Sequence, residues 1–168
     1  VRVLATGQWL QTGDMHDMSW HHNTVLMHDG RVLKTGGMTE VYDPQTGLFE
    51  ELLAIGEQQF EWGHTSTVLA DGRVLITGGG YYGGSDNAYV FSQSPVSLRP
   101  VGPMSADRTE HTATLLKDGR VLIVGGQGYG DWPYPSKVRS HASAEIFDPA
   151  TGTFSATGPM NEARAGHT

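Results

Sequence analysis

Three histidines stand at one repeated position, and histidine is a common metal ligand and proton carrier in proteins. His22, His64 and His111 each lie seven residues before an Asp-Gly-Arg-Val-Leu segment. Equivalent residues of successive repeats lie too far apart to reach one ion at about 2 Å. We therefore interpret them as neutral histidines that hydrogen-bond to a neighbouring turn or strand. The sequence predicts no metal site.

Two glycine-rich segments, 81–87 and 127–141, combine aromatic rings with acidic and amide side chains. Aromatic rings stack on the C–H faces of a sugar, while carboxylates and amides bind its hydroxyl groups. The alternative is a pair of solvated loops that pack on themselves. The residues expected to bind a protein or carbohydrate ligand are Tyr81, Tyr82, Asp86, Asn87, Tyr129, Asp131, Trp132, Tyr134 and Arg139.

A second set of candidate ligand residues stands three positions before each histidine of the repeat. Their types vary between copies, as expected for the rim of a specific binding site. The alternative role for an arginine at this position is to brace its own loop. The residues are Ser19, Glu61, Arg108 and Arg164, of which we expect the last three to bind ligand.

No pattern in the sequence predicts catalysis. The chain has no cysteine, which excludes disulfides, thiolate ligands and thiol nucleophiles. It also lacks a Gly-x-Ser-x-Gly elbow, a His-Glu-x-x-His helix and a phosphate-binding loop. Asp86, Asp131 and Glu61 carry carboxylates, but nothing in their spacing brings two of them together for acid–base chemistry. We predict no catalytic residue and no cofactor.

The elements that must position these residues form an internal repeat. Asp-Gly-Arg-Val-Leu begins at Asp29, Asp71 and Asp118, with spacings of 42 and 47 residues. Alternating residues before the Asp-Gly step and mostly apolar residues after it predict the two strands of a β-hairpin. We expect the Asp-Gly step to form a tight turn of the two-residue type. A glycine pair follows each hairpin.

A third strand with an aromatic residue and a fourth strand complete each copy, and a Pro-x-Thr-Gly turn joins them in two copies. Four short antiparallel strands per repeat predict an all-β propeller with three complete four-stranded blades and partial blades at both ends. The predicted ranges are 1–15 for the third and fourth strands of a partial blade, 16–57, 58–104 and 105–160 for the blades, and 161–168 for the start of a further blade.

The glycine pairs, the aromatic residues of the last two strands and the His-Thr-x-Thr-x-Leu-x-Asp-Gly-Arg-Val-Leu pattern resemble the bacterial form of the kelch repeat, also found in galactose-oxidase-like proteins. This resemblance implies a kelch-type β-propeller that acts as a non-enzymatic binding or scaffolding module. The alternative is the propeller part of a carbohydrate-active enzyme or sugar oxidase with catalytic residues outside this segment. Galactose oxidase uses copper and a Tyr–Cys crosslink, which a chain without cysteine cannot form.

Composition limits the partners. The formal net charge is −7, and the eleven basic residues are scattered, which argues against nucleic acid and anionic membranes. We recognise neither a membrane span nor a signal peptide. The chain begins at Val1, and we expect it to join the remaining blades of a longer chain or to self-associate through open blade edges. We expect a secreted or cell-surface bacterial protein, with a cytoplasmic one as the alternative.

Overall fold

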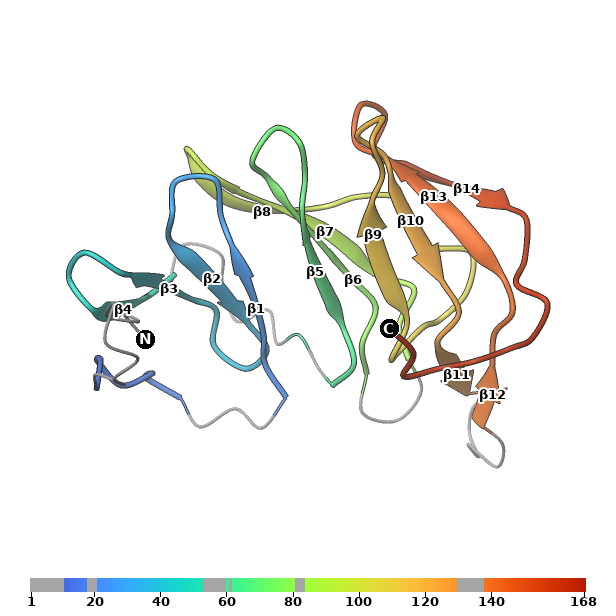
Figure 1. The fold of residues 1–168 in the computed structure, drawn as a ribbon, viewed down its shortest axis with the longest axis horizontal. Helices are drawn as coiled ribbons and strands as arrows, with labels where there is room; N and C mark the ends of the chain where they lie inside the picture. Colours follow the sequence, from blue (N-terminus) through green and yellow to red (C-terminus); the bar gives the residue numbers. More distant parts are fainter. Residues whose placement is uncertain (1–10, 18–20, 53–59, 61, 81–83, 130–137) are drawn as a thin grey trace, which may run out of the picture.

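The computed structural model describes residues 11–17, 21–52, 60, 62–80, 84–129 and 138–168, and this part of the chain contains fourteen β-strands. Three four-stranded antiparallel sheets stand side by side (Figure 1). Among the described residues, no helix is long and apolar enough to cross a membrane.

The sheets follow the repeat. The first contains β1 (Asn23–Leu26), β2 (Val32–Thr35), β3 (Glu40–Asp43) and β4 (Leu48–Glu51). The second contains β5 (Thr65–Val68), β6 (Val74–Thr77), β7 (Ala88–Gln93) and β8 (Val96–Pro100). The third contains β9 (Thr112–Leu115), β10 (Val121–Val124), β13 (Ala144–Asp148) and β14 (Thr153–Thr157).

The three sheets pack face to face in the manner of propeller blades. The first strands of successive sheets are neighbours, since β1 contacts β5 and β5 contacts β9. Leu33 and Val41 of the first sheet pack against Val74, Ile76 and Phe91 of the second. The opposite face of the second sheet packs against the third, through Leu75, Val90, Val121, Ile123 and Phe147. These contacts confirm the prediction of an all-β chain built from four-stranded antiparallel sheets.

The first hairpin of each repeat has a longer turn than expected. In the third sheet, Leu116 N–H bonds to Arg120 O at 2.7 Å and Gly119 N–H bonds to Leu116 O at 3.0 Å. Lys117 to Gly119 therefore form a three-residue loop, in which Gly119 takes the left-handed conformation at φ 87°. The two-residue turn was wrong, because the strand pairing ends at Leu116 and Arg120 and so leaves Lys117 in the loop.

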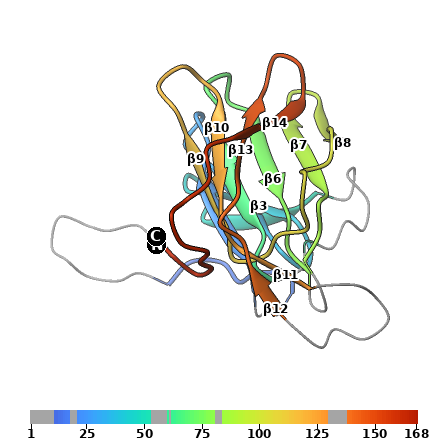
Figure 2. The ribbon, with the colours of Figure 1, turned by 90° about the vertical axis from the view of Figure 1, so that its right-hand side faces the viewer.

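The two ends of the variable segment after β10 pair with each other as the strands of a further hairpin, which the sequence did not predict. It consists of β11 (Gln127–Tyr129) and β12 (Val138–Ser140). Figure 2 shows this hairpin at the opposite end of the third sheet from the β9–β10 and β13–β14 turns. The variable segment after β10 and the short turns therefore lie at opposite ends of the third sheet.

Candidate functional site

The connections that follow second and fourth strands meet at one end of the sheets, which we name the loop face. It comprises residues 84–87, 105–111, 125–129 and 138–143. Two backbone bridges join these segments: Ser85 pairs with Arg108, and Thr109 pairs with Gln127. Both variable segments are therefore attached to neighbouring residues of the loop that precedes β9.

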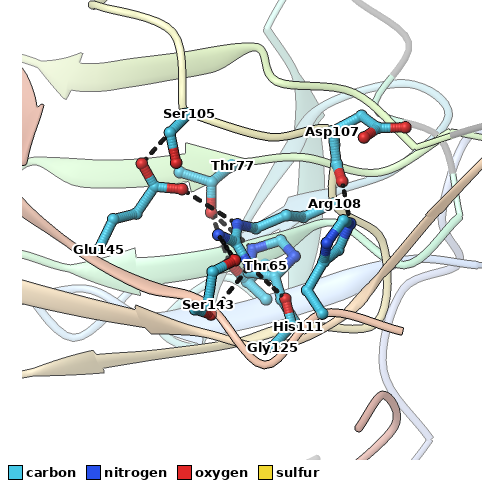
Figure 3. A network of polar contacts seen from close by, with 10 residues as sticks. Thr65, Thr77, Ser105, Asp107, Arg108, His111, Gly125, Ser143 and Glu145 are labelled. Atoms are coloured by element: carbon cyan, nitrogen blue, oxygen red, sulfur yellow. Dashed lines mark hydrogen bonds and ion pairs between the residues drawn. The ribbon is translucent and has the colours of Figure 1, made fainter. Parts of the chain in front are cut away.

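Arg108 forms the rigid centre of this face. Its side chain is fully buried, and its Nε lies 3.0 Å from Oε1 of the equally buried Glu145. The Nη1 atom donates to Gly125 O at 2.6 Å and Nη2 donates to Ser143 Oγ at 2.8 Å (Figure 3). Ser105 N–H binds the other oxygen of Glu145 at 2.9 Å. Arg108 thus has the bracing role that the sequence left open as the alternative to ligand binding.

His111 connects the second and third sheets. Its Nε2 lies 2.9 Å from Thr77 Oγ1 and 3.0 Å from Thr65 Oγ1, both in the second sheet. Burial, together with the positive charge of Arg108 beside it, lowers the pKa of His111 to about 3. His111 is therefore neutral at ordinary pH, and His64 makes the equivalent contact with Thr35 at 2.8 Å. The interpretation of these two histidines as hydrogen-bonded structural residues is confirmed.

In the first sheet a lysine, Lys34, supplies the positive charge that Arg108 supplies in the third sheet. Glu40 corresponds to Glu145, and the residue three positions before its histidine is Ser19, which lies outside the described residues. The cation comes instead from Lys34 of β2, whose fully buried Nζ lies 3.2 Å from Glu40 Oε2 and also pairs with Asp17. His16 Nδ1 lies 2.7 Å from Glu40 Oε1. Burial acts to raise the pKa of Glu40, but the hydrogen bonds from His16 and Lys34, together with the Lys34 charge, outweigh it and hold this pKa below its ordinary value.

Glu110 is the residue of this face that sequence reasoning missed. Its φ is 55°, and among the residues that the structure describes it is the one non-glycine residue with positive φ. The equivalent residues Gly63 and Gly166 also have positive φ, at 76° and 62°. Glu110 is partly exposed, and its Oε2 accepts a hydrogen bond from Gln127 Nε2 at 3.1 Å. Comparing the residue before each repeated histidine would have identified it.

Four of the predicted ligand residues are exposed in the structure: Asp86, Asn87, Arg139 and Arg164. Arg164 pairs loosely with Glu162 at 3.6 Å, and its backbone oxygen accepts a bond from Gly126 N–H at 2.9 Å. Tyr129 ends β11, opposite Val138. The remaining candidates lie outside the described residues: Glu61, Tyr81, Tyr82, Asp131, Trp132 and Tyr134.

Two surface hollows lined by described residues lie away from the loop face. One lies among the turns of the second and third sheets and includes Asp71, Gly119 and Pro149. The other lies on the first sheet beside His16 and Phe49. Within the described ranges, no three His, Cys, Asp or Glu side chains converge as metal ligands would.

No family model matches this chain, and no curated protein sequence matches it. Among solved structures, it is similar to a fungal alcohol oxidase of the AA5 family in complex with copper, with 17% sequence identity and a TM-score of 0.56. The alignment covers 89% of this chain and 46% of that one, so this chain spans about half the length of that protein. At this identity the likeness concerns the fold, and together with the stacked four-stranded sheets it shows a β-propeller-type architecture.

Proposed function

We propose that this segment is a non-enzymatic binding module whose loop face takes a carbohydrate ligand. One observation carries the proposal: both variable segments are attached to the loop that Arg108 braces. Ser85 follows the first segment's tyrosines and pairs with Arg108, while Gln127 begins the second segment and pairs with Thr109. Binding residues in propellers and similar scaffolds lie on variable loops that a rigid frame positions.

The exposed side chains of this face suit a polar, hydroxyl-bearing ligand. Asp86 offers two acceptors, Asn87 offers both a donor and an acceptor, and Arg139 offers donors only. The tyrosines and the tryptophan of the two segments provide, by sequence, rings for stacking on a sugar. The buried Arg108–Glu145 pair keeps the attachment points fixed, so less conformational entropy is lost on binding.

A glycan array followed by calorimetry tests this proposal. The double variant Asp86→Ala/Asn87→Ala is expected to weaken saccharide binding at least tenfold, and Lys117→Ala, on the turn at the opposite end, is the matched control. Equal weakening in both proteins, or no saccharide binding by the wild-type protein, would contradict the proposal. Binding of a protein instead of a saccharide, lost in the double variant, would assign the face to a protein ligand.

The alternative is the propeller part of an alcohol- or sugar-oxidising enzyme, favoured by the likeness to the AA5 alcohol oxidase. The described residues do not fit a copper centre by themselves, because no three of their His, Cys, Asp or Glu side chains converge and the chain has no cysteine. Catalytic residues would then lie elsewhere in a longer protein. Oxygen uptake by a copper-loaded protein containing this segment, with a primary alcohol as substrate, distinguishes this enzyme from a binding module.

A further inference from the structure

Glu110 has a backbone conformation that its own side chain disfavours. The left-handed region is unfavourable for a residue with a Cβ atom, and glycine avoids this cost. The backbone contacts at this position do not need the side chain. Glu110 N–H donates to Gly63 O at 2.9 Å, and Glu110 O accepts from Gly166 N–H at 2.9 Å. A glycine here would keep both bonds and remove the strain.

The carboxylate is held by a residue that is itself fixed. Gln127 N–H donates to Thr109 O at 2.8 Å, and Thr109 N–H donates to Gln127 O at 2.9 Å, which pins the start of β11 beside Glu110. From there Gln127 Nε2 donates to Glu110 Oε2 at 3.1 Å. An atom added at Cα of Gly166 would stand 3.8 Å from the same carboxylate oxygen. The Glu110 carboxylate therefore lies between Gln127 and Gly166, and Gly166 has no side chain to fill the space beside it.

We propose that Glu110 and Gln127 form a subsite for a pair of neighbouring hydroxyl groups of a carbohydrate, an inference that rests on the proposed function. A hydroxyl group both donates and accepts hydrogen bonds. The carboxylate of Glu110 accepts only, and the Gln127 side chain supplies an N–H donor and an oxygen acceptor next to it. A cation would meet that N–H donor, and no three candidate metal ligands converge in the described part of the chain. The pair therefore fits a diol better than a metal ion.

The test compares Glu110→Gly with Glu110→Ala. Both variants lose the carboxylate, and both are expected to bind the saccharide found by the glycan array at least tenfold more weakly. Only Glu110→Gly also removes the backbone strain, so it is expected to raise the melting temperature by roughly 2–4 °C. Glu50→Gln, which removes an exposed carboxylate of β4, is the matched control and is expected to change neither quantity.

The outcomes separate this subsite from the function on which it rests. If the wild-type protein binds a saccharide and both variants keep its affinity, the subsite is wrong and the proposed function stands. A lower melting temperature for Glu110→Gly would also overturn the inference, because the side chain would then be structural. If the wild-type protein binds no saccharide, the proposed function and the subsite fail together. Binding of Ca²⁺ alone, lost in both variants, would replace the subsite by a cation site.

Discussion

Lys34 and Glu40 form a buried ion pair in the first sheet at the place where Arg108 and Glu145 form one in the third. The two carboxylates occupy equivalent positions in β3 and β13, but the cations come from different elements. Arg108 belongs to the loop before the sheet, whereas Lys34 lies opposite Glu40 in β2. At the position of Lys34 the other two sheets have Ile76 and Ile123. The same buried carboxylate position is thus paired with a strand lysine in the first sheet and with a loop arginine in the third.

Replacing Lys34 with the isoleucine of the other sheets is expected to destabilise the chain. Lys34→Ile leaves Glu40 buried without its cation, which costs about 3–5 kcal/mol in such pairs. Lys34→Ile/Glu40→Tyr recreates the Ile76–Tyr89 pair of the second sheet and is expected to recover at least half of that loss. Urea unfolding measures both, and Lys117→Ile on the exposed turn is the control. Equal losses in the single and double variants would contradict the prediction.

Arg108→Lys tests whether the guanidinium geometry matters beyond its charge. A lysine can pair with Glu145 but cannot also reach Gly125 O and Ser143 Oγ as the planar guanidinium does. The expected cost is about 2–3 kcal/mol, because buried acceptors lose their donors. Arg139→Lys, at an exposed position of β12, is expected to change the unfolding free energy by no more than about 0.5 kcal/mol.

The repeat could be predicted from sequence because each copy carries the same local signals. Thr-x-Thr alternation in two copies, and Asp-Gly turns and glycine pairs in all three, act over a few residues, and the structure forms a sheet from each copy. His64 and His111 could also be interpreted correctly, since a residue type that recurs in every copy usually supports the fold rather than one site.

Features that occur once in the chain could not be predicted in the same way. The Lys34–Glu40 pair and the Glu110–Gln127 contact join residues that the repeat does not relate, so their partners follow only from the tertiary structure. The burial of Arg108 depends on Glu145, 37 positions away, which a local pattern cannot reveal. Lys34 nevertheless leaves one signal: it interrupts a strand that is apolar in the other copies.

The outer face of the third sheet is expected to associate with another sheet. Strand alternation turns Leu122 and Ile146 away from the second sheet, and both remain partly exposed. We propose that the remaining blades of a longer chain, or a second copy, cover them. The 168-residue chain is then expected to sediment as a species heavier than 18.1 kDa, and Leu122→Glu to weaken that association. A stable, folded monomer would contradict this prediction.

The lowered pKa of His111 predicts that acid begins to destabilise the chain as the pH falls below about 6.5, above the range in which carboxylates ordinarily titrate. The folded-state pKa of about 3 lies below the ordinary value of 6.5, so the folded state resists a proton that the unfolded chain accepts. Stability from this group is complete above pH 6.5 and falls as the pH drops toward 3, by up to about 1.4 kcal/mol per pH unit. Urea unfolding between pH 7.5 and 4.5 measures that slope.

The slope can be assigned to His111 by substitution. His111→Gln keeps an N–H donor for Thr77 but does not titrate, so it is expected to be less stable at pH 7.5 and to show a flatter pH dependence down to 4.5. His28→Gln, at an exposed turn position, is expected to keep the wild-type slope. If His111→Gln kept the same slope as the wild-type protein, the acid sensitivity would belong to other groups. Protonation of His111 would then not explain why acid weakens the contact between the second and third sheets.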